Sequence, residues 1–149
     1  MKPDVGTVMQ GFFGTLLGDV APHLNAEYSM GNVGIMGMMM FMTAEEYDRA
    51  ADIRAAENAE MRSLFSHAAA LVTDDALKKK LAAAASEKEG SLRVTALNAR
   101  NAALAALLIE LQTHVEASDA SWASALEARI WDHLVAATER RKLPLPSFG

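Results

Sequence analysis

The sequence predicts an all-α fold, a helical bundle of about five helices, from three observations. Prolines stand only at positions 3, 22, 144 and 146, so the interior from residue 23 to 143 lacks the strongest helix breaker. Alanine, the residue with the highest helix propensity, dominates that interior. Apolar residues recur at intervals of three and four positions, which is the period of one face of a helix. A chain of 149 residues fits one domain with a single core.

The first two helical regions together extend from about residue 5 to about residue 72. The first runs from about residue 5 to Pro22. Its apolar stripe recurs at helical spacing: Val5, Val8, Met9, Phe12, Phe13, Leu16, Leu17 and Val20. The second region extends from near Asn25 to about Val72. Thr43 and Glu46 have the form of a capping box, which marks the start of a helix. The sequence does not decide between one long helix and a break at Thr43.

Three further helices follow, each with its own boundary signals. A short helix is expected to begin at Asp74, because carboxylates are favourable at a helix N-terminus, and to end near Ala85. Ser86 and Glu89 offer another capping box before a helix from about Ser91 to Glu116. The last helix presents one face made of Trp122, Leu126, Ile130, His133, Leu134 and Ala137. It ends at the cations of residues 140–142, and residues 144–149 are expected to form an extended tail.

Two of these helices carry heptad seams, spaced alternately by three and four positions. One seam comprises Val94, Leu97, Asn101, Leu104, Leu108, Leu111 and Val115. The other comprises Ala51, Arg54, Asn58, Met61, Phe65, Ala68 and Val72. Such seams predict a coiled-coil-like contact, and an asparagine in a seam needs a polar partner. We expect an antiparallel pair with Asn58 opposite Asn101 and Phe65 near Val94. The alternative is that each asparagine pairs with its own copy across a homodimer axis.

The seam also contains the candidate ligand-binding residues Arg54, Asn58 and Asn101. Both asparagines are interpreted first as polar groups that fix the register of the core. Arg54 is interpreted first as a side chain that reaches water from the end of the seam. Glu57 and Glu60 are expected to be surface charges of the helix, and Glu110 with His114 a solvated pair. The competing hypothesis is a small-molecule-binding bundle, or an enzyme, with a polar pocket around Arg54, Asn58 and Asn101.

Composition argues against several classes of function. The formal net charge is −5 with both signs interspersed, which is not typical of a nucleic-acid-binding protein. Cysteine is absent, so a thiolate metal site is excluded and a reducing cytoplasm fits best. No motif for a cofactor, a metal or catalysis is present. The uncharged run from Tyr28 to Ala44 covers 17 positions, fewer than the roughly 20 of a transmembrane helix.

Five of the nine methionines lie between residues 36 and 42, in a stretch that is apolar all round. A helix of that kind has to be buried. We expect an interface made of Gly31, Gly34, Ile35, Met38, Met39 and Met42. A homodimer is favoured, and a groove for an amphipathic helix of another protein or for an apolar ligand is the alternative. A peripheral membrane role is weakened by the lack of cations on the first helix.

The sequence therefore predicts a single domain in three parts. Residues 1–42 are the apolar N-terminal helices that form the interaction surface. Residues 43–143 are the amphipathic bundle, and residues 144–149 are the tail. The expected function is that of a non-enzymatic protein-protein interaction or scaffold protein, homodimeric through its Met-rich segment.

Overall fold

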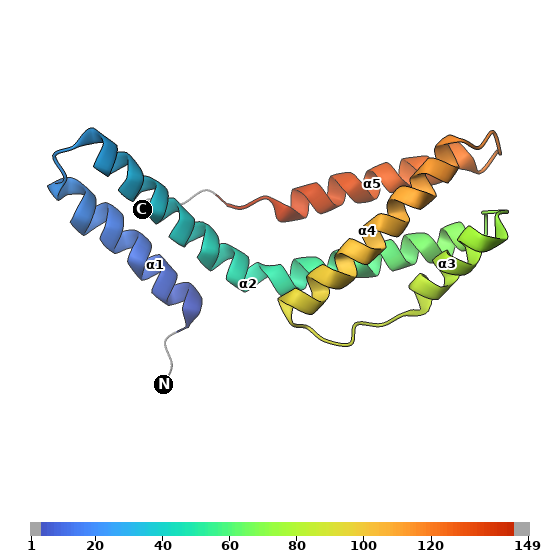
Figure 1. Cartoon of the computed structure of the whole chain (residues 1–149), viewed down its shortest axis with the longest axis horizontal. Coiled ribbons are helices and arrows are strands. Elements are labelled where there is room, and N and C mark those ends of the chain that lie inside the picture. The colour runs from blue at the N-terminus through green and yellow to red at the C-terminus, as the bar shows by residue number, and fades with distance from the viewer. Residues whose placement is uncertain (1–3, 145–149) are drawn as a thin grey trace. The chain divides into compact units, whose positions relative to one another are not determined.

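The computed structural model describes residues 4–144, and in that part the protein is helical without a strand. Five α-helices follow one another, together with a short π-helix and a 3₁₀-helix (Figure 1). They are α1 (Val5–Thr15), the π-helix η1 (Leu16–Val20), the 3₁₀-helix η2 (Ala21–His23), α2 (Glu27–Ala69), α3 (Asp75–Ser86), α4 (Val94–Glu116) and α5 (Ala123–Arg141). The predicted all-α class is confirmed. The expected tail lies outside the described residues, except for Pro144.

The chain divides into two compact units. The first contains the residues up to Ala50 together with the segment that begins at Leu143, and the second runs from Ala51 to Lys142. Helix α2 contributes its N-terminal half to the first unit and its C-terminal half to the second. The boundary predicted after Met42 falls inside α2 and within the first unit.

Helix α2 continues without a break through Thr43. The Thr43 hydroxyl donates a 2.7 Å hydrogen bond to the carbonyl of Met39, one turn earlier in the same helix. This bond is the ordinary arrangement of a threonine inside a helix, and it leaves the hydroxyl unavailable as a cap. The Thr43 signal is therefore not a helix start, and the single long helix is the correct alternative.

In the first unit, α1 packs antiparallel against the N-terminal half of α2. The rings of Phe13 and Phe41 lie 5.7 Å apart between centroids. At Gly37 the helices approach closely, because a Cβ atom there would lie 3.3 Å from Leu17. Gly37 is therefore the glycine at which the sequence provides for close helix contact.

The apolar stripe of the first helix is only partly turned inward. Phe13, Leu16 and Leu17 are half-buried, whereas Phe12 and Val20 are exposed. The π-helix explains the change after Leu17, since the backbone N–H of Ala21 bonds to the carbonyl of Leu16, five residues earlier. This wider turn brings Ala21 rather than Val20 to the half-buried side.

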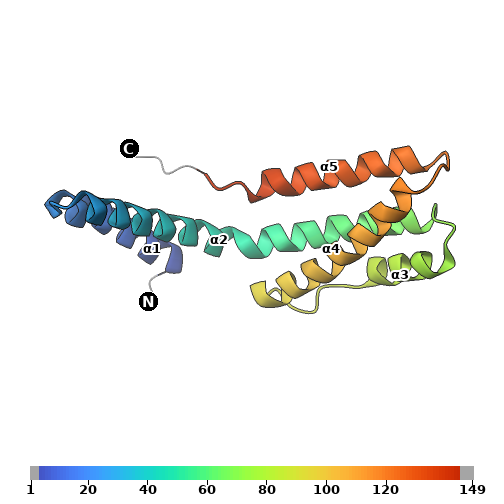
Figure 2. The same ribbon diagram turned by 45° about the horizontal axis from the view of Figure 1, so that its top comes forward.

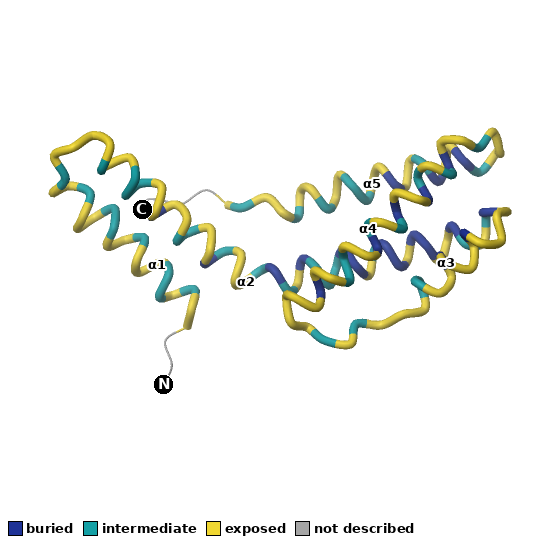
Figure 3. The backbone as a smooth tube through the Cα atoms, viewed as in Figure 1, coloured by how far each residue is buried: buried dark blue, intermediate teal, exposed yellow. Residues whose placement is uncertain are grey.

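The second unit is a four-helix bundle in which successive helices alternate in direction. The C-terminal half of α2 and α4 run one way, and α3 and α5 run the other (Figures 1 and 2). The buried positions gather along their inner faces (Figure 3). The core consists of Met61, Leu64, Phe65, Ala68, Val72, Leu77, Leu81, Leu104, Leu108, Leu111, Val115, Ala123, Leu126 and Ile130.

The expected antiparallel pairing of the two heptad seams is wrong, although both seams are buried over most of their length. Paired residues keep a constant offset, 44 positions between Arg54 and Asn98 and 43 between Asn58 and Asn101, as parallel helices require. The same offset puts Phe65 level with Leu108, and both belong to the core. Val94, its predicted neighbour, is 38% exposed. The loop after α3 makes this possible, because it returns the chain to the end of the bundle where the second-unit part of α2 begins.

Of the two predicted helix starts after α2, the one at Asp74 is confirmed and the capping box of Ser86 and Glu89 is not formed. The Asp74 side chain accepts a 2.7 Å hydrogen bond from the backbone N–H of Leu77 and caps α3. By contrast α4 begins at Val94 with Arg93 as its N-cap residue. Glu89 does not cap it, because its carboxylate accepts a hydrogen bond from Asn58 and pairs with Arg62 of α2.

Among the described residues, α4 alone is long and apolar enough to cross a membrane by length and composition. A helix that contributes to a protein core passes the same test. Here α4 buries Leu97, Leu104, Leu108, Leu111 and Val115 in the bundle. Packing inside the second unit thus accounts for these five residues, whereas Ile109 of the same helix is 67% exposed.

Candidate functional site

Arg54, Asn58 and Asn101, the predicted ligand-binding residues, come together between α2 and α4 in the second unit. The Asn101 amide donates a 3.0 Å hydrogen bond to Oδ1 of Asn58 within the same chain. Asn58 is fully buried and donates in turn to Glu89 at 3.0 Å and to the carbonyl of Leu97 at 3.4 Å. The Arg54 Nε donates to Oδ1 of Asn98 at 2.8 Å. The amides of Asn58 and Asn101 thus bond to each other, whereas Arg54 bonds to Asn98 on the same helix as Asn101.

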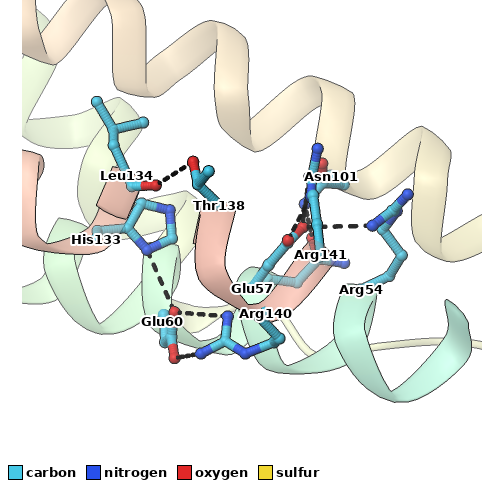
Figure 4. Close-up of polar contacts among 10 residues, drawn as sticks. Arg54, Glu57, Glu60, Asn101, His133, Leu134, Thr138, Arg140 and Arg141 are labelled. Carbon is cyan, nitrogen blue, oxygen red and sulfur yellow. Dashed lines mark hydrogen bonds and ion pairs between the residues drawn. The ribbon is translucent and has the colours of Figure 1, made fainter. Parts of the chain in front are cut away.

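Glu57 stands at the centre of this cluster, and its expected place on the helix surface is wrong. Its residue surface is 1% exposed. The Arg141 guanidinium donates two hydrogen bonds of 2.6 Å to its two carboxylate oxygens, and Asn101 donates a third at 3.2 Å (Figure 4). Nη1 of Arg54 lies 3.8 Å from the same carboxylate. A planar, bidentate arginine pair of this kind satisfies a buried carboxylate well.

The surroundings of Glu57 favour its ionised form. Burial by itself would raise the pKa of the carboxyl, since it removes water from the charge. The hydrogen bonds from Arg141 and the positive charges of Arg141, Arg54 and Arg140 outweigh burial. Together they hold the pKa of Glu57 below its ordinary value, so the group is a carboxylate at neutral pH and is unsuited to act as a proton donor.

A second ion cluster joins the same two helices, α2 and α5. Arg140 pairs with both oxygens of Glu60 (Figure 4). The Nδ1 atom of His133 lies 3.3 Å from Oε2 of Glu60 and forms an ion pair with it when the ring is protonated. The His133 side chain is 10% exposed, as expected for a residue on the inner face of the last helix. Glu60 is 40% exposed, so its cluster borders on solvent.

Arg62 forms the third part of the network. Its Nη1 atom lies 2.7 Å from Glu89, whose carboxylate also accepts from Asn58. Nε and Nη2 of Arg62 are buried without a hydrogen-bond partner among residues 4–144. Sequence reasoning missed Arg62, Glu89 and Arg141 because their partners are 27 or more positions away. The one sequence signal for this network is the number of charged residues beside the seam from Ala51 to Val72, which is otherwise mostly apolar.

A small cleft adjoins this cluster between α2, α4 and α5. Its volume is about 180 Å³, and its lining comprises Glu57, Met61, Asn101, Ala105, Leu108, His133, Leu134, Ala137, Thr138 and Arg141. Pockets that hold small molecules are commonly about 300 to 1,000 Å³. Much of the polar lining is already paired within the protein, so the cleft offers few free groups to a ligand.

The predicted interface residues lie in the first unit, on the N-terminal half of α2. Ile35 is 61% exposed, Met38 40%, Met39 61% and Met42 44%. Gly31 is exposed, and a Cβ atom at Gly31 or Gly34 would meet nothing within 4 Å. Gly34 is half-buried on the side nearer to Gly37. Sequence reasoning missed further exposed apolar residues of this unit, among them Tyr28 at 82%, Met36 at 52% and Phe12 at 51%.

Other candidate positions have structural partners. Glu110 pairs with Lys80 of α3 at 2.6 Å, and the His114 ring stacks on Trp122 with centroids 6.2 Å apart. The expected solvated pair of Glu110 and His114 is therefore wrong. Within residues 4–144, no group of three or more histidine, aspartate or glutamate side chains is arranged to hold a metal ion.

Comparison of the chain with protein-family models found no match. Comparisons with curated proteins and with solved structures found no similar protein either.

Proposed function

We propose that this protein is a non-enzymatic interaction or scaffold protein that forms a homodimer through the Met-rich face of α2. That face is defined by Tyr28, Gly31, Ile35, Met38, Met39 and Met42. The observation that carries the proposal is its exposure, since each of the five large apolar side chains is 40% exposed or more.

The Met-rich face lies opposite the side of α2 that α1 covers. Residues of an α-helix are about 100° apart around its axis. With Gly37 directed at α1, Met42, Ile35 and Tyr28 lie about 140°, 160° and 180° away from it. Gly31, Ile35, Met38 and Met42 also follow the alternate spacing of four and three that a coiled-coil partner requires. The face is therefore a continuous stripe and not a scatter of single apolar residues.

A second copy of the chain is the partner that best fits this stripe. Exposed apolar patches of this kind mark interaction sites, and symmetric dimers are the commonest assemblies of soluble proteins. No residue from Tyr28 to Ala44 is charged, so two copies can meet without burying an unpaired charge. Methionine side chains are flexible enough to fill the space between two such helices.

The polar cluster of the second unit supports a structural role for that unit. Asn101 donates to Asn58 and to Glu57, and Arg54 donates to Asn98. The adjoining cleft is smaller than ordinary ligand pockets. We infer that this cluster fixes the register of the bundle, so that the bundle acts as a rigid body attached to the interaction surface.

The test is sedimentation velocity of three full-length proteins: the unchanged chain, Met38→Glu and Tyr47→Glu. Met38 lies on the Met-rich face, and Tyr47 is 58% exposed on another side of α2. We expect a dimer for the unchanged chain and for Tyr47→Glu. Met38→Glu is expected to be monomeric, because each copy would bring an unpaired carboxylate into the interface. A monomeric unchanged chain, or equal effects of the two substitutions, would contradict the proposal.

A further inference from the structure

The methionines of the Met-rich face are sulfur donors as well as apolar side chains. The chain has no cysteine, so its nine methionines are its whole supply of sulfur, and five of them lie between residues 36 and 42. The thioethers of Met38, Met39 and Met42 are all on the open side of α2 and are 40%, 61% and 44% exposed.

The spacing of these three residues brings their side chains to one place. Met38 and Met42 are four positions apart and Met39 and Met42 three, so each pair are neighbours on the helix surface, with Cβ atoms about 5–6 Å apart. Methionine is unbranched and has three rotatable side-chain bonds, so its sulfur can move toward a shared centre. The third pair, Met38 and Met39, is adjacent in sequence, and both side chains flank Met42.

The chemistry of this donor set selects a particular class of ion. Thioethers are soft, neutral ligands that favour Cu(I), whereas Mg²⁺ and Ca²⁺ require oxygen donors. No carboxylate or imidazole occurs between Tyr28 and Ala44, and the nearest carboxylates, Glu45 and Glu46, lie one helical turn beyond Met42. Three neutral donors leave a bound monovalent ion with its single charge, which suits a site that remains open to water.

We propose that Met38, Met39 and Met42 form a binding site for a soft monovalent metal ion of the Cu(I) class. Binding is a simple association in which the ion enters as Cu(I) and leaves as Cu(I), and no electron is transferred. The site needs only one copy of α2, but it shares a face with the proposed dimer, so a bound ion and a second copy compete for that face.

The experiment uses Ag(I) as a redox-stable probe of the same class, titrated calorimetrically into the full-length protein in chloride-free buffer. The test variant is the triple substitution Met38→Leu, Met39→Leu and Met42→Leu, which removes the sulfurs and keeps the apolar surface. Met30→Leu is the matched control. Met30 lies on the same helix and is 48% exposed, and no methionine stands three or four positions from it.

We expect one equivalent of Ag(I) to bind the unchanged chain and Met30→Leu, and that equivalent to be lost in the triple variant. Binding by the triple variant equal to that of the unchanged chain would overturn the inference, as would no binding by the unchanged chain. Sedimentation in metal-free buffer separates the two proposals. A dimer that binds no Ag(I) refutes only the metal site, and a monomer that binds it through these methionines refutes only the dimer.

Discussion

At the scale of single residues, Glu57 has the most unusual environment described in this protein. A carboxylate that is 1% exposed is stabilised by Arg141 of α5, Asn101 of α4 and the nearby Arg54. These three partners come from different parts of the sequence, so Glu57 links three helices of the second unit. Its charge therefore couples the docking of α5 to the packing of α2 and α4.

The lowered pKa of Glu57 makes stability depend on pH. Because its pKa in the folded protein lies below the ordinary value near 4.5, the unfolded chain binds more protons in acid. The stabilisation is fully present above the ordinary pKa and is lost as the pH falls through the folded-state pKa. We expect Glu57→Gln to lower the free energy of unfolding at pH 7 by about 1–3 kcal/mol. We also expect it to flatten the decline below about pH 5.

Urea unfolding of both proteins over a pH series measures this effect. Glu139→Gln is the control, since Glu139 is 59% exposed and pairs with Lys142, the residue that follows its helix. An exposed ion pair of this kind contributes about 1 kcal/mol or less. If the free energy of unfolding depends on pH in the same way for the unchanged chain and for Glu57→Gln, Glu57 is not the source of that dependence.

Asn58 and Asn101 give a second prediction at the residue scale. Because their side chains share a hydrogen bond, Asn58→Ala and Asn101→Ala should not act independently. We expect a coupling free energy of about 0.5–3 kcal/mol in a double-mutant cycle followed by urea unfolding. The control is the pair Asn58→Ala and Asp74→Ala. Asp74 caps α3 and does not contact Asn58, so we expect the two changes in the free energy of unfolding to add. A coupling within error of zero would mean that the two amides do not interact in solution.

At the scale of helices, Asp74 and Thr43 carry similar start signals and have different roles. Asp74 accepts from the backbone of Leu77, whereas Thr43 bonds back to Met39 inside a continuous helix. We expect Asp74→Ala to destabilise the second unit by about 1 kcal/mol. Thr43→Ala removes no cap and should change the free energy of unfolding by less than half as much. Thermal or urea unfolding of both variants checks the contrast, and a larger loss for Thr43→Ala would contradict it.

The same comparison explains how far the sequence predicts these helices. Period and composition predict the helical class, and the Asp74 signal predicts the start of α3, because both depend on local chemistry. A cap motif is ambiguous, since the same hydroxyl can bond forward or backward along the chain. The choice at Thr43 depends on whether the preceding residues are already helical, and this is set by the packing of α1 along α2.

Pairing between helices was harder to predict than the helices themselves. Both heptad seams are buried and Asn58 meets Asn101, but a seam carries no information about direction. The parallel order of the two seams follows from the loop after α3, which returns the chain to the end of the bundle where the second-unit part of α2 begins. The Glu57 cluster could not be predicted because its partners on α4 and α5 are 44 and 84 positions away. By contrast, the Met-rich face required only the local sequence.

At the scale of the whole molecule, the two units differ in how far they bury their apolar surface. The second unit buries a contiguous core and fastens its helices with ion pairs. In the first unit, two helices cover one side of each other and leave Ile35, Met39 and Tyr28 exposed. A hairpin of two helices has too little core to cover such a surface by itself, and this is the physical basis for the proposal of a second copy.

The most direct test of this account is the mass of the unchanged full-length chain by light scattering over a range of concentrations. The account predicts twice the chain mass of 16.0 kDa, with dissociation only on dilution. A mass equal to one chain at every concentration would contradict it and would mean that the Met-rich face does not bind its own copy.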